Sequence, residues 1–163
     1  MQQDMTREWV VMKFGGSSVS SVDCWKTICS QVKRNAEDGK HVLVVVSALT
    51  GVTDLLTRLC SETVPEDSGS LLSELRSRHL QLLGELGLPV PGDFRERWNE
   101  LAGLLKDRET CLLPEERTLA MAHGELLSSI IGQQALRLAR MMAVPLHCLN
   151  TAPWCRPNKG RTP

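Results

Sequence analysis

A short segment near the N-terminus, Lys13 to Val19 (Lys-Phe-Gly-Gly-Ser-Ser-Val), combines a basic side chain with two glycines and two serines directly after an apolar run. A buried strand that turns on glycines into a helix is suited to hold phosphate. Backbone amides beside residues without a Cβ can approach an anion closely, and the N-terminus of a helix is electropositive. Lys13 would add a mobile positive charge at the terminal phosphate. A Gly-Gly pair after a strand is also a common tight turn, so this segment needs support from elsewhere in the chain.

Two further groups of residues could complete such a site. The small, polar segment Ser47 to Thr53 follows a second apolar run, and Glu125 lies within a long helical pattern. Ligands of open α/β sheets gather beyond the carboxyl ends of the strands, so the two turns should share one rim, where Glu125 could face a cationic ligand group. The alternatives are that the serine and threonines cap a helix and that Glu125 is a solvated helix acid.

The elements that must position these residues form a βαβ unit. Trp9 to Phe14 is predicted to be a strand, and a helix capped by Ser20 or Ser21 follows and ends at Gly39. His41 to Ser47 is continuously apolar in its middle, which is typical of a parallel strand covered on both faces. The pattern predicts an α/β protein with a mainly parallel sheet.

The rest of the chain is predicted to form helices and one further strand near the C-terminus. Residues 71–86 and 94–105 should form an antiparallel hairpin beside the sheet, with Asp93 and Glu96 as a capping box and His79 in the core or at its boundary. A helix begins at Pro114 and continues to Met142, and residues 144–149 can form a strand. The predicted apolar stripe of that long helix is Leu119, Ala122, Leu126, Ile130 and Leu138.

Composition narrows the function. The 163 residues include 19 basic and 19 acidic side chains without a long basic block, which gives no support for a nucleic-acid or anionic-membrane partner. The longest apolar run, residues 42–46, is too short to span a bilayer, and the N-terminus is polar, so we expect a cytoplasmic protein that acts on small molecules. Six scattered cysteines without a Cys-x-x-Cys pair argue against a zinc site and indicate reduced thiols.

Three segments together resemble the aspartokinase family of amino-acid kinases. They are residues 13–19, residues 45–53 (Val-Val-Ser-Ala-Leu-Thr-Gly-Val-Thr) and residues 123–128 (His-Gly-Glu-Leu-Leu-Ser), and the likeness covers roughly residues 9–142. Residues 78–88 are most similar to kinase domains fused to diaminopimelate decarboxylase. The resemblance implies the amino-acid kinase fold, a three-layer α/β/α sandwich. It also implies transfer of a phosphoryl group from ATP, with Mg²⁺, to L-aspartate, giving 4-phospho-L-aspartate. This is the first step of lysine, threonine and methionine biosynthesis, and the intact enzyme is expected to be a homo-oligomer.

The same resemblance implies roles for individual residues. Lys13 is the expected catalytic residue, and it binds the ATP phosphates together with Gly15, Gly16 and Ser17. No protein ligand for a metal is implied. The residues expected to bind aspartate are Ser47, Thr53 and Glu125.

The resemblance is incomplete at its C-terminal end. Family members continue with a Gly-Arg-Gly-Gly-Ser-Asp segment, a nucleotide-base site and regulatory domains, and residues 150–163 do not match that segment. We therefore expect residues 1–149 to be the N-terminal half of a catalytic domain and residues 150–163 to be an irregular tail. The fold would be incomplete, and the chain alone would lack measurable aspartokinase activity. The alternative is a non-catalytic remnant or interaction module that retains the first half of the kinase fold.

Overall fold

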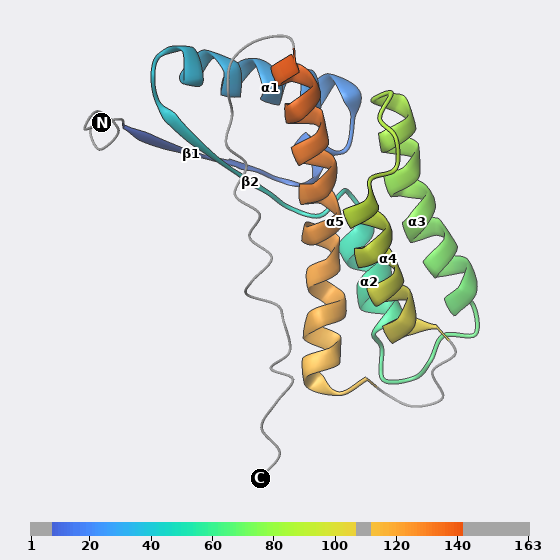
Figure 1. The fold of residues 1–163 in the computed structure, drawn as a ribbon. Coiled ribbons are helices and arrows are strands. Elements are labelled where there is room, and N and C mark those ends of the chain that lie inside the picture. The colour runs from blue at the N-terminus through green and yellow to red at the C-terminus, as the bar shows by residue number, and fades with distance from the viewer. Residues whose placement is uncertain (1–7, 107–111, 142–163) are drawn as a thin grey trace.

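The computed structural model describes residues 8–106 and 112–141. Strand β1 (Trp9–Phe14) leads through a short 3-10 turn, η1 (Gly16–Val19), into helix α1 (Val22–Glu37) and strand β2 (His41–Val46). Four helices follow, and Figure 1 shows three of them gathered beside the fourth and longest, α5. Their bounds are α2 Val52–Leu59, α3 Ser68–Glu85, α4 Gly92–Leu105 and α5 Pro114–Met141.

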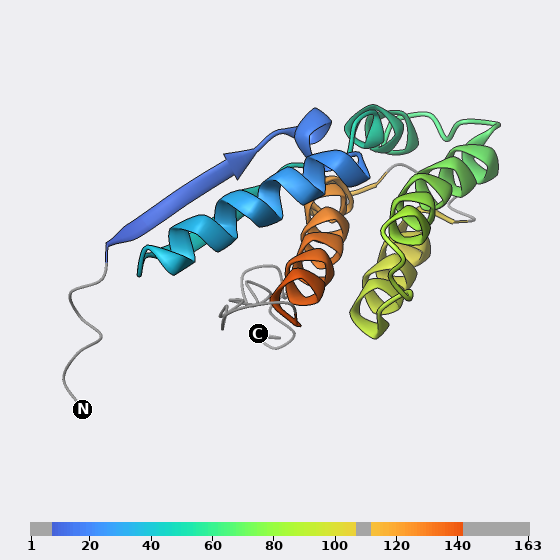
Figure 2. The ribbon, with the colours of Figure 1, turned by 90° about the horizontal axis from the view of Figure 1, so that it is seen from above.

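The two strands form a parallel ribbon, which confirms the predicted βαβ unit. The register runs from Trp9 opposite His41 to Phe14 opposite Val46. Helices α1 and α5 lie on the same side of the ribbon (Figure 2), and both contact β2. On the other side, Trp9 and Val11 are 59% and 63% exposed. The expectation that both faces are covered is therefore wrong within the described residues, because none of the described helices packs on this second face.

Local signals in the sequence set both ends of α1. The hydroxyl of Ser21 accepts a hydrogen bond from the amide of Cys24 and caps α1, as predicted. Gly39 follows the end of α1 with a φ of 78°, a left-handed conformation that favours glycine. The predicted capping box is wrong: α4 begins at Gly92, one residue before Asp93, and its capping position, Pro91, offers no side-chain hydrogen bond.

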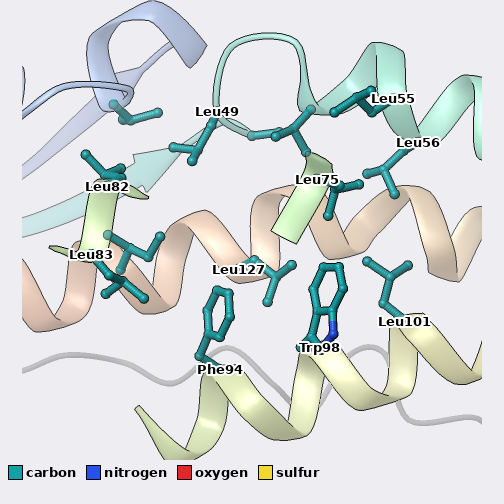
Figure 3. Close-up of a cluster of buried hydrophobic side chains, with 14 of the residues drawn as sticks. Leu49, Leu55, Leu56, Leu75, Leu82, Leu83, Phe94, Trp98, Leu101 and Leu127 are labelled. Carbon is teal, nitrogen blue, oxygen red and sulfur yellow. The ribbon is translucent and has the colours of Figure 1, made fainter. Parts of the chain in front are cut away.

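The helices α2 to α5 enclose the main core. Figure 3 shows leucines from α2 and α3 meeting the aromatic side chains of α4 over α5. The α3 and α4 hairpin contacts α2 and α5 rather than lying beside the sheet, and α4 packs chiefly along α5. His79 is fully buried in this core, as predicted. The buried residues of α4 match the predicted stripe except for Leu104, and they are Phe94, Trp98, Leu101 and Leu105.

The predicted stripe of α5 is out of phase with the buried face. Leu138 is 46% exposed, and the other predicted positions are only partly buried. This difference arises because α5 contacts five elements, α1, β2, α2, α3 and α4, so residues on several sides of it are covered. Small or polar residues occupy much of that surface. The buried residues of α5 are Ala120, His123, Gly124, Leu127, Ser128, Ile131, Gly132, Ala135 and Leu136.

No helix among the described residues has the length and apolar character needed to cross a bilayer. The predicted strand at residues 144–149 and the tail at 150–163 lie outside the described residues, as does Met142.

Candidate active site

Both strands end at the same edge of the ribbon, and the two predicted turns begin there. The ladder extends one step past β2, because the amide of Ser47 donates to the carbonyl of Phe14 at 3.0 Å. Gly15 begins the turn that follows β1, and Ala48 lies in the turn that follows β2. This arrangement follows from the parallel pairing, which places the carboxyl ends of both strands together.

Gly16 allows the first turn to lie directly against the second. A Cβ added to Gly16 would lie 2.8 Å from the carbonyl oxygen of Ala48, so only glycine fits at this distance. A hydrogen-bond chain joins the same two turns. Ser20 Oγ donates to the carbonyl of Gly16 at 2.6 Å and accepts from the amide of Thr50 at 2.8 Å.

Helix α5 reaches the same point from the interior. A Cβ added to Gly124 would lie 2.9 Å from the Cβ of Ala48, so the glycine lets the helix approach the second turn. The next residue, Glu125, is exposed and accepts a long hydrogen bond of 3.4 Å from the amide of Ala48 through Oε1. The glycine turn, the segment 47–53 and Glu125 therefore converge on Ala48.

Lys13 and the remaining residues of the first turn lie at the border of this junction. Lys13 is exposed, lies on the same open face of β1 as Val11, and makes no ion pair with the described part of the chain. Gly15 has no atom of the described residues within 4 Å of a Cβ position, and its φ of −76° is open to any residue. Ser17 is exposed in η1.

The residues expected on the aspartate side flank the second turn. Ser47 is partly buried at the end of β2, whereas Thr53 is exposed in the first turn of α2. The side chain of Thr53 is oriented by no hydrogen bond within the described ranges, although its carbonyl accepts one from Thr57 Oγ1 at 2.8 Å. In the sequence, Ser47 precedes and Thr53 follows Thr50, which is the residue held by Ser20.

The sequence does not predict the contacts that two further residues make at this junction. Ser20 was considered only as a helix cap, but its hydroxyl bridges the two turns. Arg78 of α3 donates to the carbonyl of Thr50 through Nη1 at 3.0 Å. The sequence does contain an i,i+4 pair of Glu74 and Arg78, but no pattern in it identifies a backbone carbonyl from another segment as the partner.

No group of three metal-binding side chains occurs in residues 8–106 and 112–141. Three of the six cysteines, Cys24, Cys29 and Cys60, are described, and Cys24 and Cys29 are free thiols. Burial raises the pKa of Cys29, which keeps this thiol protonated and unreactive at neutral pH. The other three cysteines lie outside the described residues.

The chain is similar to known proteins of one family. The chain matches the model of the amino acid kinase family over residues 8–160. It is 33% identical over 123 residues to an aspartokinase of Chlamydia trachomatis, covering 75% of this chain and 26% of that protein. It is 38% identical over 65 residues to an aspartokinase of Rickettsia bellii, covering 40% of this chain and 16% of that protein.

A solved structure shares the fold. The crystal structure of E. coli aspartokinase III in complex with aspartate and ADP superposes with a TM-score of 0.69 at 28% identity, covering 80% of this chain and 29% of that one. The sequence thus spans about a quarter or less of the two curated relatives described above. The family match extends over nearly all of its residues, and the chain belongs to the amino acid kinase family.

Proposed function

We propose that the protein carrying these residues is an aspartokinase, which transfers the γ-phosphoryl group of ATP to the side-chain carboxylate of L-aspartate. The observation that carries the proposal is the convergence of the glycine turn, the second turn and Glu125 on Ala48. The relatives described above are aspartokinases, and one of them was solved with aspartate and ADP. The proposed role in the cell is the cytoplasmic first step of lysine, threonine and methionine biosynthesis, carried out by a homo-oligomer.

The first turn is the proposed phosphate side. Packing accounts for the glycine at position 16 but not for the one at position 15, where the described residues leave the Cβ position open. A phosphate approaching the backbone would account for Gly15, because its oxygens need room beside the amides of Gly15, Gly16 and Ser17. Lys13 has no competing ion pair among the described residues, so its ammonium is available to the transferring phosphoryl group.

The second turn and α5 are the proposed aspartate side. Ser47 and Thr53 offer hydroxyl groups near the substrate, and Glu125 supplies a carboxylate for its α-ammonium group. The hydrogen bond of Glu125 to Ala48 is long and uses one oxygen, so the other oxygen remains free to accept from an ammonium. A charge-assisted hydrogen bond of this kind favours a cationic over a neutral ligand.

In the reaction, a carboxylate oxygen of aspartate attacks the γ-phosphorus, the bond from that phosphorus to the bridging oxygen breaks, and ADP leaves. Charge on the phosphoryl oxygens must be stabilised, and a positioned lysine with backbone amides suits this step. The Mg²⁺ ion is proposed to enter with the nucleotide and to be held mainly by phosphate oxygens. Residues 1–149 are the proposed N-terminal part of this catalytic domain.

The test uses the full-length product of the gene that carries this sequence, assayed with ATP, Mg²⁺ and L-aspartate by trapping the acyl phosphate with hydroxylamine. Lys13→Ala should lower kcat by about a hundredfold or more, because a preorganised charge at the transferring group is lost. Glu125→Gln should mainly raise the KM for aspartate, because it removes the negative charge that faces the ammonium.

Lys26→Ala is the matched control. Lys26 is an exposed lysine of α1 that pairs with Asp23, so its loss removes one positive charge without changing the junction. Its kcat should equal that of the wild type. Equal kcat values for Lys13→Ala and the wild type, or hydroxamate formation that does not depend on aspartate, would contradict the proposal. A folded protein without any activity would favour the non-catalytic alternative.

A further inference from the structure

The backbone of Thr50 is held from two sides by residues outside its own segment. Its amide donates to Ser20 Oγ at 2.8 Å, on the side of the glycine turn. Its carbonyl accepts from Arg78 Nη1 at 3.0 Å, on the side of α3. Since Thr50 is the central residue of the segment 47–53, these two bonds fix the middle of the turn between Ser47 and Thr53.

The guanidinium of Arg78 is itself held in place. Glu74, one helical turn earlier, accepts from Nε at 3.2 Å and from Nη2 at 2.7 Å through the same carboxylate oxygen, which leaves Nη1 for Thr50. Gly51 leaves room for the guanidinium of Arg78 beside the backbone of the turn. It has a φ of 75°, and a Cβ there would lie 2.8 Å from Nη1, so the guanidinium lies directly against the backbone.

Global stability is a poor explanation for this arrangement. The side chains of Arg78 and Glu74 are 42% and 48% exposed, and ion pairs at such positions contribute little to the free energy of unfolding. Their geometry is nevertheless specific, because three donors of one planar group are used on two fixed acceptors. A fixed donor aimed at a backbone carbonyl determines where that carbonyl lies.

We propose that Arg78 is a positioning residue for the segment 47–53, acting through the carbonyl of Thr50 on Ser47 and Thr53. This inference rests on the proposed function, in which those two hydroxyl groups face aspartate. Loss of Arg78 would release the α3 side of the turn, whereas the Ser20 side, which holds the glycine turn, would remain. The consequence should therefore fall on aspartate more than on ATP.

The kinetic test compares Arg78→Met with Arg76→Met in the full-length gene product. Arg76 lies on the same helix, but its guanidinium lies over the ring of Trp98 at 5.6 Å from the centroid, away from the turn. Arg78→Met should raise the KM for aspartate about tenfold, since small displacements of positioning groups have effects of this size or larger, and should change the KM for ATP less than about twofold. Arg76→Met should leave both constants unchanged.

Two further variants separate positioning from a general loss of folded protein. A lysine at position 78 has a single donor group, so Arg78→Lys should restore part of the affinity for aspartate. Glu74→Gln leaves Arg78 in place but weakens the contact that orients it, and should raise the KM for aspartate less than Arg78→Met does. Simple destabilisation would instead reduce the fraction of enzyme that is folded. The apparent kcat would then fall, and the KM values for aspartate and ATP would stay unchanged.

A second readout does not depend on activity. Amide hydrogen exchange at residues 47–53 should become faster in Arg78→Met and stay at the wild-type rate in Arg76→Met, because the first variant loses the bond to Thr50. Unchanged exchange in Arg78→Met would overturn the inference, as would an unchanged KM for aspartate in an active enzyme. If the wild type does not phosphorylate aspartate, the proposed function fails, and the exchange result alone decides whether Arg78 positions the turn.

Discussion

Helix α5 and the outer face of the β1–β2 ribbon differ in how closely their residues are packed. Along α5, Gly124 and Gly132 bring the helix so close to its neighbours that an added Cβ would lie within 3.0 Å of another atom. On the ribbon, Trp9 and Val11 are large apolar residues that remain more than half exposed. The proposed site lies at the boundary, where the strands leave the open ribbon and enter the closely packed region.

This difference in packing indicates which residues determine the position of the proposed site. Close contacts at glycines contribute to the position of α5 and of the two turns, because a backbone that lies directly against a neighbouring backbone or a rigid ring has few alternative arrangements. The apolar side chains of the outer ribbon face contribute little to positioning, since none of the described helices packs on that face. Substitutions should therefore have large effects at the small residues of α5 and small effects at the large residues of the ribbon.

Among the glycines of α5, the largest effect on stability is expected for Gly132→Ala. An added Cβ would lie 2.4 Å from Cη2 of Trp25, whose buried indole cannot move freely because Nε1 donates to the carbonyl of Val19 at 2.9 Å. Overpacking of this kind costs about 1–3 kcal/mol, which exceeds the roughly 1 kcal/mol gained by replacing a helical glycine. We expect a net loss of about 1 kcal/mol or more in the free energy of unfolding, measured by urea titration with tryptophan fluorescence.

Gly103→Ala is the matched control, because Gly103 is also an interior helical glycine but has nothing within 4 Å of its Cβ position. Here only the helix-propensity term remains, and the protein should be stabilised by about 0.5–1 kcal/mol. If both variants changed the free energy of unfolding in the same direction, the close packing of α5 against α1 would be disproved.

A smaller effect on stability is expected for Gly124→Ala. The added Cβ would lie 2.9 Å from the Cβ of Ala48 and 3.2 Å from Cδ1 of Leu56. The side chain of Leu56 can adjust in part, so overpacking and helix propensity should nearly cancel, leaving a loss of about 0.5–1 kcal/mol. The adjustment moves Ala48 away from Glu125, so the KM for aspartate should rise in the hydroxamate assay. A stabilised variant with an unchanged KM would show that α5 does not determine the position of the second turn.

The sequence predicted the elements better than the contacts between them. The bounds of β1 were predicted correctly, and β2 ends one residue earlier than predicted, because short apolar runs beside glycine turns are unambiguous signals. The buried stripe of α4 was predicted almost completely, since one face of this helix carries most of its large apolar residues. The stripe of α5 was wrong, because a periodicity of large residues cannot detect a face on which glycine, alanine and serine make the closest contacts.

The candidate site shows the same limit. Its three segments were identified by residue type, and the structure brings two turns and Glu125 together at Ala48. The bonds that hold Thr50 join residues 28 and 30 positions apart through backbone atoms, which every residue possesses and which no side-chain pattern distinguishes. The roles of Lys13, the glycine turn, Ser47, Thr53 and Glu125 in binding and catalysis stay predictions until the variants are measured.

A pH-dependent effect is expected from His79, in the packed half of the molecule. Burial lowers the pKa of His79 below its ordinary value of 6.5, and the bond between Nδ1 and the carbonyl of Leu75 only partly opposes this shift. The unfolded chain therefore binds the proton more readily than the folded one, so the contribution to stability is complete above pH 6.5 and is lost as the pH falls below it. Urea titrations at pH 7.5 and pH 5.5 should show a smaller loss of stability in His79→Leu than in the wild type. Equal losses would show that His79 does not contribute to the acid sensitivity.

The smallest effect is expected on the outer face of the ribbon, for Val11→Thr. Val11 is 63% exposed, whereas Trp9 on the same strand stacks on His41 at 4.8 Å and is less suitable for the test. Threonine keeps the β-branched shape, so the free energy of unfolding should change by less than about 0.5 kcal/mol. Val44→Thr is the control on the covered face, where the side chain packs against the core, and it should cost about 1–3 kcal/mol because a hydroxyl group loses contact with water. A loss for Val11→Thr as large as that for Val44→Thr would mean that the outer face is covered in solution, and the contrast between the two regions would not hold.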